Sequence, residues 1–107
     1  MTNKINVLLL DDSEIITSHI KKMLKEVDCI DTIESALNMK VAREILQKEN
    51  IDILVLDIQL VEGNGIDFLK WVTYRYLHIC VIMLSNNSDA VHRTISKKYG
   101  ADYFLDK

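Results

Sequence analysis

Each of four mainly apolar stretches is followed by polar residues that suit chemistry: Asp11, Asp12, Asp57, Ser85 and Lys107. The stretches are residues 5–10, 51–56, 79–84 and 101–106. Three carboxylates in a partly buried site would repel one another unless a cation lay between them, and oxygen ligands suit Mg²⁺. An acceptor carboxylate, a divalent metal, a lysine and a hydroxyl are the parts that phosphoryl transfer to an aspartate requires. The pattern therefore predicts a magnesium-dependent phosphoryl acceptor site, with Asp57 as the acceptor.

Simpler interpretations exist for the same residues. Carboxylates stabilise the amino ends of helices, and the three aspartates could precede helices for that reason alone. A serine after a strand is often a cap or turn residue, which is the competing interpretation of Ser85. Because all five residues follow apolar stretches at regular intervals, the phosphoryl acceptor hypothesis is favoured.

Parallel strands with helices on both faces would bring these residues together. The runs Val7–Leu10 and Ile53–Leu56 are continuously apolar, which is typical of strands buried on both faces. Right-handed crossovers would align the carboxyl ends of all strands along one edge of the sheet. We therefore predict an α/β fold: a doubly wound, flavodoxin-like, five-stranded parallel sheet with strand order 2-1-3-4-5. Its first and third strands flank the ligand site.

Amphipathic segments between the strands predict the helices. Ser13 and Asn38 are expected to cap the first two, and Ser88 or Asp89 a fourth that Gly100 ends. Strands are expected at residues 5–10, 31–37, 51–56, 78–84 and 101–106, with no helix after the last one. The side chains expected to face the sheet are Ile16, Ile20, Met23 or Leu24, Val27, Val41, Ala42, Ile45, Leu46, Ile66, Leu69, Val72, Tyr76, Val91, Ile95 and Tyr99.

Length and composition favour one soluble domain. The chain has 107 residues, enough for a single core, so residues 1–107 are predicted to form one domain. A net charge of −3 offers no basic surface for direct nucleic-acid binding. The apolar runs are too short to span a membrane, which favours a cytoplasmic protein. His19 is expected on the polar side of the first helix, and Cys29 and Cys80 have no metal-binding spacing.

Four short motifs occur in order along the chain. They are Leu-Asp-Asp-Ser at 10–13, Val-Leu-Asp-Ile-Gln-Leu at 55–60, Met-Leu-Ser at 83–85 and Gly-Ala-Asp-Tyr-Phe-Leu-Asp-Lys at 100–107. Each is unspecific alone, but the ordered set resembles the receiver (CheY-like) domains of two-component response regulators. Val61 and Asn86 depart from the family, which commonly has a proline and a small residue there. The family's final helix is also absent from this sequence.

The resemblance implies a role for each matching residue. Asp11 and Asp12 look like the metal-binding acidic pair, and Asp57 looks like the phosphoacceptor, which also binds the metal. In the family the backbone carbonyl at the position of Gln59 is a further metal ligand. The remaining roles are the switch hydroxyl, the phosphoryl-contacting lysine and the switch aromatic, which match Ser85, Lys107 and Phe104.

The resemblance also implies a function in a phosphorelay. A histidine kinase or phosphotransfer protein would donate a phosphoryl group to Asp57 with Mg²⁺ bound, and the change at Ser85 and Phe104 would alter binding of an output partner that the sequence does not identify. Such a protein is a signalling phosphoacceptor rather than an enzyme with a separate substrate. Without a final helix, the sheet face beside the first helix is expected to stay apolar and open to a partner or to a second copy in a homodimer.

Three rival hypotheses remain at this point. A pseudo-receiver would keep the fold but bind partners without phosphorylation, which the short chain end and Asn86 favour and the intact acidic set opposes. An aspartate-nucleophile phosphohydrolase needs a second carboxylate two residues after the nucleophile, where this chain has Gln59. A nucleotide-binding Rossmann domain is disfavoured because no GxGxxG motif follows the first strand.

Overall fold

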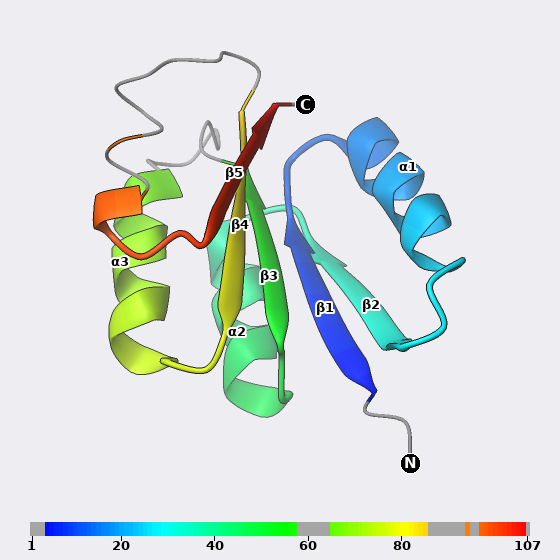
Figure 1. The fold of residues 1–107 in the computed structure, drawn as a ribbon, viewed down its shortest axis with the longest axis horizontal. Helices are drawn as coiled ribbons and strands as arrows, with labels where there is room; N and C mark the ends of the chain where they lie inside the picture. The colour runs from blue at the N-terminus through cyan, green and yellow to red at the C-terminus, as the bar shows by residue number, and fades with distance from the viewer. Residues whose placement is uncertain (1–3, 58–64, 86–93, 95–96, 107) are drawn as a thin grey trace.

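The computed structural model describes residues 4–57, 65–85, 94 and 97–106. They form one parallel sheet with strand order β2-β1-β3-β4-β5 and helices in the connections (Figure 1). The elements are β1 (Ile5–Leu10), α1 (Glu14–Leu24), β2 (Ile30–Ala36), α2 (Met39–Lys48), β3 (Ile53–Asp57), α3 (Gly65–Arg75), β4 (Cys80–Ser85) and β5 (Tyr103–Asp106). The predicted fold class and strand order are confirmed, and no helix follows β5 within the described part of the chain.

One face of the sheet carries the packed core. Alternate residues of β3 and β4, namely Leu54, Leu56, Val81 and Met83, are completely buried in it. The helices α2 and α3 lie on this face (Figure 1) and contribute Ala42, Leu46, Phe68, Leu69 and Val72 to the same cluster. Each large apolar side chain buried there contributes about 1.5–3 kcal/mol, so this face supplies most of the hydrophobic stabilisation.

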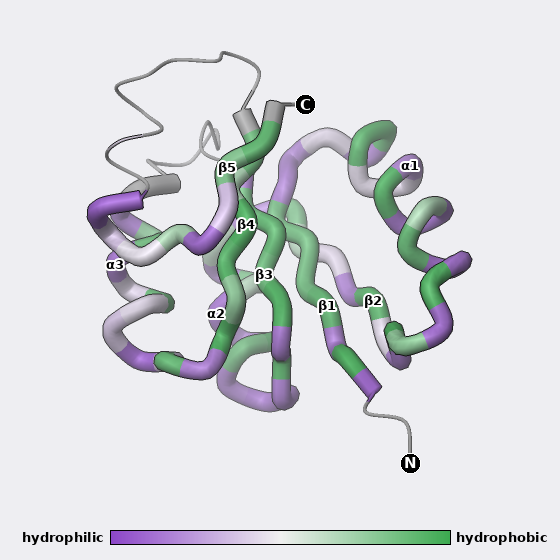
Figure 2. Tube along the Cα trace, viewed as in Figure 1, coloured by the Kyte–Doolittle hydropathy of each residue, from purple (hydrophilic) through white to green (hydrophobic). Residues whose placement is uncertain are grey.

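Within the described residues, α1 is the one helix on the opposite face (Figure 1). The intervening strand residues Val55 and Ile82 point to this face and stay partly exposed. Figure 2 shows the hydrophobic stretches of β1, β3 and β4 side by side, with no helix in front of β3 and β4. The two faces of one sheet are therefore covered to very different extents.

Side-chain caps begin the first two helices, as predicted. The Ser13 hydroxyl accepts the N–H of Ile16 at 3.3 Å, and the Asn38 side-chain oxygen accepts the N–H of Val41 at 2.9 Å. Such caps satisfy amide groups that have no partner inside a helix. In the described part of the chain, no helix is both long enough and apolar enough to cross a membrane.

Several local predictions were wrong. The first helix ends at Leu24, so Val27 lies in the following turn and is 42% exposed instead of facing the sheet. Of the two alternatives Met23 or Leu24, Leu24 is the inward residue and Met23 is exposed. Thr17, which was not expected inside, is buried. The cause is the turn after Leu24, where the N–H of Val27 donates to the carbonyl of Leu24 and ends the helical repeat.

Smaller shifts affect the next elements and the fourth helix. The strand β2 runs over Ile30–Ala36, one residue earlier than expected, and Val41 is partly exposed at the start of α2. Most of the predicted fourth helix, with its caps and two of its inward residues, lies outside the described residues, as does the Ile66 side chain. Gly100 does end the described helical turn, with a φ of 108° that disfavours any side chain.

Two carboxylates join the strands at their amino ends. Asp52, just before β3, accepts the backbone N–H of Asn6 in β1 at 2.9 Å. Asp102, just before β5, accepts the backbone N–H of Val81 in β4 at the same distance. Each aspartate thus satisfies an amide of the neighbouring strand where the ladder begins, and helps to set the register of that pair.

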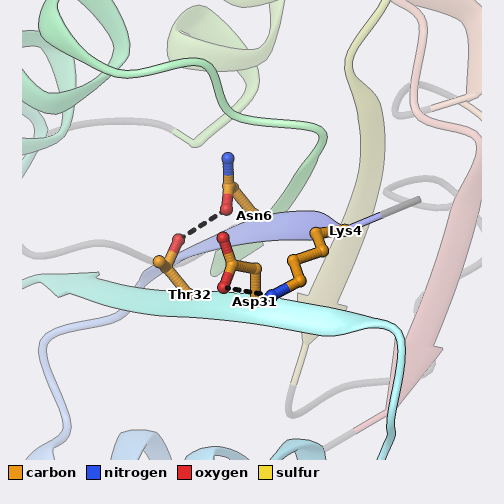
Figure 3. A network of polar contacts seen from close by, with 4 residues as sticks. All are labelled: Lys4, Asn6, Asp31 and Thr32. Atoms are coloured by element: carbon orange, nitrogen blue, oxygen red, sulfur yellow. Dashed lines mark hydrogen bonds and ion pairs between the residues drawn. The ribbon is translucent and has the colours of Figure 1, made fainter. Parts of the chain in front are cut away.

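Further polar contacts lie at the same edge. The side-chain oxygen of Asn6 accepts the hydroxyl hydrogen of Thr32 at 2.8 Å, and Lys4 lies 4.0 Å from a carboxylate oxygen of Asp31 (Figure 3). Partial burial, and then the nearby carboxylate of Asp102, raise the pKa of the Cys80 thiol. The amino edge is therefore a set of mutually satisfied polar groups.

Candidate functional site

Neighbouring strands place two predicted site residues side by side. Leu10 of β1 and Leu56 of β3 are register partners, so Asp11 and Asp57 follow at the same level of the sheet. Both aspartates are only 3% exposed. Two buried carboxylates on adjacent strands are unusual, because a buried charge is destabilising unless it is compensated.

The third aspartate completes a cluster. One carboxylate oxygen from each of Asp11, Asp12 and Asp57 lies within 4.8 Å of the others, and Asp12 is exposed. Oxygen ligands of a single Mg²⁺ lie about 2.0–2.1 Å from the ion, so ligands on opposite sides of it are about 4 Å apart. The oxygen chemistry of the cluster suits Mg²⁺ with water molecules as its remaining ligands, and three oxygens within 4.8 Å need to draw together by less than about 1 Å to bind one ion directly. The structure thus brings together the three acidic residues that the sequence singled out.

The loop after β1 orients one member of the cluster. A carboxylate oxygen of Asp11 accepts the backbone N–H of Ser13 at 2.9 Å, while the Ser13 hydroxyl caps α1. Ser13 was predicted only as a cap, and its second role in holding Asp11 was missed. An aspartate two residues before a helix cap is a recognisable signal for this turn, because aspartate side chains readily accept the amide two positions later.

The hydroxyl and lysine positions are only partly described. Ser85 ends β4 and is the register partner of Asp106, one step beyond the pairing of Leu84 with Asp57. The backbone of Ser85 therefore reaches the same edge as Asp57, whereas its side chain lies outside the described atoms. Lys107 and Gln59 lie outside the described residues, and their roles stay predictions.

The predicted switch aromatic lies in the last strand. Phe104 is the register partner of Met83, is half-buried and packs against the core cluster. A hollow of about 190 Å³ beside it is also lined by Lys97 and Tyr103. Phe104 thus connects the core to the surface of β5, which is the position that a residue transmitting a change would need.

Comparison with known proteins identifies the family. A family model described as the response regulator receiver domain matches residues 7–107. The chain therefore belongs to the receiver domains of two-component response regulators, a family of phosphoacceptor signalling domains.

Two curated relatives show how the chain relates to longer proteins. The transcriptional regulatory protein DegU of Brevibacillus brevis is 27% identical over 105 residues, which cover 98% of this chain and 44% of DegU. A protein-glutamate methylesterase/protein-glutamine glutaminase of Burkholderia thailandensis is 33% identical over 86 residues, covering 80% of this chain and 24% of that protein. The chain thus spans less than half of these relatives.

A solved structure gives the same assignment. The receiver domain of a Francisella response regulator is 30% identical and superimposes with a TM-score of 0.86. The match covers 97% of this chain and 84% of that domain. Family and fold therefore agree with the geometry at the carboxyl edge of the sheet.

Proposed function

We propose that Asp57 accepts a phosphoryl group from a histidine kinase or phosphotransfer protein. The observation that supports this most directly is the convergence of Asp11, Asp12 and Asp57 within 4.8 Å at the carboxyl edge. Residues 1–107 act as a single cytoplasmic receiver unit that does not bind nucleic acid itself. Its signal is a change in the binding of an output partner.

The residues of the chain position the transfer. An oxygen of the Asp57 carboxylate forms the bond to phosphorus while the bond from phosphorus to the imidazole nitrogen of the donor breaks, and that nitrogen keeps the electron pair. Asp11 and Asp12, with Asp57 and the backbone carbonyl of Gln59, would hold Mg²⁺. The bound ion would offset the negative charge of the carboxylates and the phosphoryl oxygens. Ser85 at the end of β4 and Lys107, which comes directly after β5 in the chain, would contact the phosphoryl group.

The readout involves the last two strands. A contact from Ser85 to the new phosphoryl group would draw the end of β4 toward Asp57, since the two residues end adjacent strands. Phe104, the β5 neighbour of Met83, then changes its packing and with it the surface beside Lys97. A partner that recognises this surface responds to the phosphorylation state.

The test is phosphorylation by a small donor. The chain is incubated with acetyl phosphate and Mg²⁺ and weighed by mass spectrometry, with Asp57→Asn and Asp52→Asn as variants. We expect one phosphoryl adduct on the wild type and none on Asp57→Asn. Asp52→Asn is the control, because Asp52 lies at the opposite edge of the sheet, and it should take up one phosphoryl group like the wild type. An adduct that survives Asp57→Asn contradicts the proposal. A wild type that takes no phosphoryl group but still binds a partner supports the pseudo-receiver instead.

A further inference from the structure

Each polar group of Ser13 takes part in a hydrogen bond at the junction between β1 and α1. Its backbone N–H donates to a carboxylate oxygen of Asp11 at 2.9 Å, and its hydroxyl accepts the N–H of Ile16 at 3.3 Å. Its carbonyl accepts the N–H of Thr17 at 3.0 Å. One residue thus joins a member of the acidic cluster to the first turn of α1.

These bonds restrict two of the three clustered aspartates. The N–H of Asp11 donates to the carbonyl of Ala36 in β2 at 3.2 Å, so the backbone of Asp11 is held in the sheet. The bond from the Ser13 N–H to the Asp11 side chain closes a turn that contains Asp12. It therefore restricts the Asp11 side chain and the Asp12 backbone together. A carboxylate has about four lone-pair sites, so Asp11 can accept this bond and still bind an ion.

The Ser13 hydroxyl determines how well this amide is held in place. Ser13 has φ −94° and ψ 111°, the extended backbone that is usual for a capping residue. Without a capping oxygen the first turn of a helix frays more readily, because one of its amides loses a partner. Fraying at Ile16 leaves the Ser13 backbone free to move, and the Asp11 side chain then loses its fixed donor.

We propose that Ser13 is a positioning residue for the magnesium site and acts through its cap on α1 rather than through contact with the ion. This inference rests on the proposed function, since it takes the three aspartates as the ligands of Mg²⁺. Coupling between two equilibria is reciprocal. If the cap strengthens Mg²⁺ binding by a given factor, bound Mg²⁺ strengthens the first turn of α1 by the same factor.

The cap of α2 offers a matched comparison. The Asn38 side chain accepts the N–H of Val41 at 2.9 Å, and the Asn38 carbonyl accepts the N–H of Ala42 at 3.2 Å. Asn38 follows β2, which is the edge strand of the sheet, and it lies far in sequence from the turn at residues 11–13. Asn38→Ala therefore removes a cap of the same kind and leaves the acidic turn as it is.

Isothermal titration calorimetry with Mg²⁺ tests the proposal. Ser13→Ala should weaken binding by about three- to tenfold, which is less than the roughly 10–100-fold typical of groups that hold a ligand directly, because the backbone N–H to Asp11 is kept. Ser13→Thr keeps the hydroxyl and should bind like the wild type, and Asn38→Ala should also bind like the wild type. Urea denaturation should show similar losses of stability for Ser13→Ala and Asn38→Ala, since each loses one cap.

The outcomes separate this inference from the proposed function. An unchanged affinity in Ser13→Ala, or an equal loss in Asn38→Ala or Ser13→Thr, overturns the role of Ser13 and leaves phosphorylation of Asp57 intact. A wild type that binds no Mg²⁺ overturns both.

Amide hydrogen exchange measured by NMR distinguishes a cap from a direct contact with the ion. In the wild type, Mg²⁺ should slow exchange of the Ile16 amide and change that of the Val41 amide on α2 much less. In Ser13→Ala the Ile16 amide should exchange faster, because its acceptor is gone. An Ile16 amide that does not respond to Mg²⁺ contradicts the coupling. Circular dichroism confirms that each variant is folded.

Discussion

Carboxylates stand at both edges of the sheet, but the protein surrounds them differently. At the amino edge, Asp52 and Asp102 each accept a backbone N–H from the neighbouring strand at 2.9 Å. At the carboxyl edge, Asp11 and Asp57 are almost fully buried and lie beside Asp12 in one cluster. The amino edge spreads its carboxylates one to a strand junction, whereas the carboxyl edge concentrates three in one place.

The difference supports the proposed distinction between structural carboxylates at the amino edge and functional ones at the carboxyl edge. An amide donor compensates a single carboxylate and lowers the free energy of the fold. Three carboxylates within 4.8 Å of one another repel when no cation lies between them, although Asp11 also accepts the Ser13 N–H. Binding of Mg²⁺, as proposed, would offset that repulsion. Variants at the two edges test whether the edges differ in this way.

Magnesium binding should depend on the carboxyl edge alone. Asp11→Asn and Asp12→Asn should each weaken Mg²⁺ binding by at least about tenfold, since even residues outside the ligand shell contribute about 10–100-fold. Asp102→Asn should leave the affinity unchanged. Isothermal titration calorimetry measures all three, and equal weakening by Asp102→Asn would show that the two edges are not distinct.

Stability should depend on the amino edge. Asp102→Ala removes the acceptor of the Val81 N–H, and Val81 is completely buried. We expect unfolding free energy to fall by about 1–3 kcal/mol, because a buried amide is left without a partner. Urea denaturation measures the change. Asp102→Asn is the matched variant, since its amide oxygen can still accept the hydrogen bond, and a loss as large as that of Asp102→Ala would contradict this explanation.

Removing one clustered charge should have the opposite sign. Without Mg²⁺, Asp57→Asn should raise the unfolding free energy by about 1 kcal/mol, because fewer carboxylates repel one another. Added Mg²⁺ should stabilise the wild type through binding to the folded state and stabilise Asp57→Asn much less. Thermal unfolding with and without Mg²⁺ gives both comparisons. Destabilisation of the metal-free variant would mean that the contacts of Asp57 outweigh the repulsion among the three carboxylates.

The smallest expected change in stability concerns Glu34, a carboxyl group that belongs to neither edge of the sheet. A hydrogen bond shared with Glu49, together with burial, raises the pKa of Glu34 on β2 above 4.5. A raised folded pKa means that the folded state binds the proton more tightly, so stability decreases as the pH rises above about 4.5 through the folded pKa. Glu34→Gln should remove this loss. The unfolding free energy of the variant relative to the wild type should rise by less than about 0.5 kcal/mol from pH 4 to pH 7, because the pair is near the surface.

Urea denaturation at the two pH values measures the Glu34 effect, and Glu44→Gln on α2 is the control. A gain that is the same at pH 4 and pH 7 would show that protonation of Glu34 does not cause it.

Local patterns account for what could be predicted. The strand order was predicted with the doubly wound fold class, the two helix caps from the residue types of Ser13 and Asn38, and the meeting of the three aspartates from parallel crossovers. The structure confirms all three predictions. The end of α1 was missed because the turn after Leu24 depends on backbone bonding and not on the apolar repeat. The roles of Ser85, Lys107 and Gln59 stay predictions, since the described atoms do not include these groups.

Short-range patterns in the sequence reveal which residues alternate between strand and helix and which carboxylates directly follow apolar strands. The surroundings of each charge and the covering of each face depend on the folded structure. It gave Asp52 and Asp102 their amide partners and placed His19 in an apolar groove. These properties depend on contacts between residues distant in the chain, and a sequence pattern contains no direct record of them.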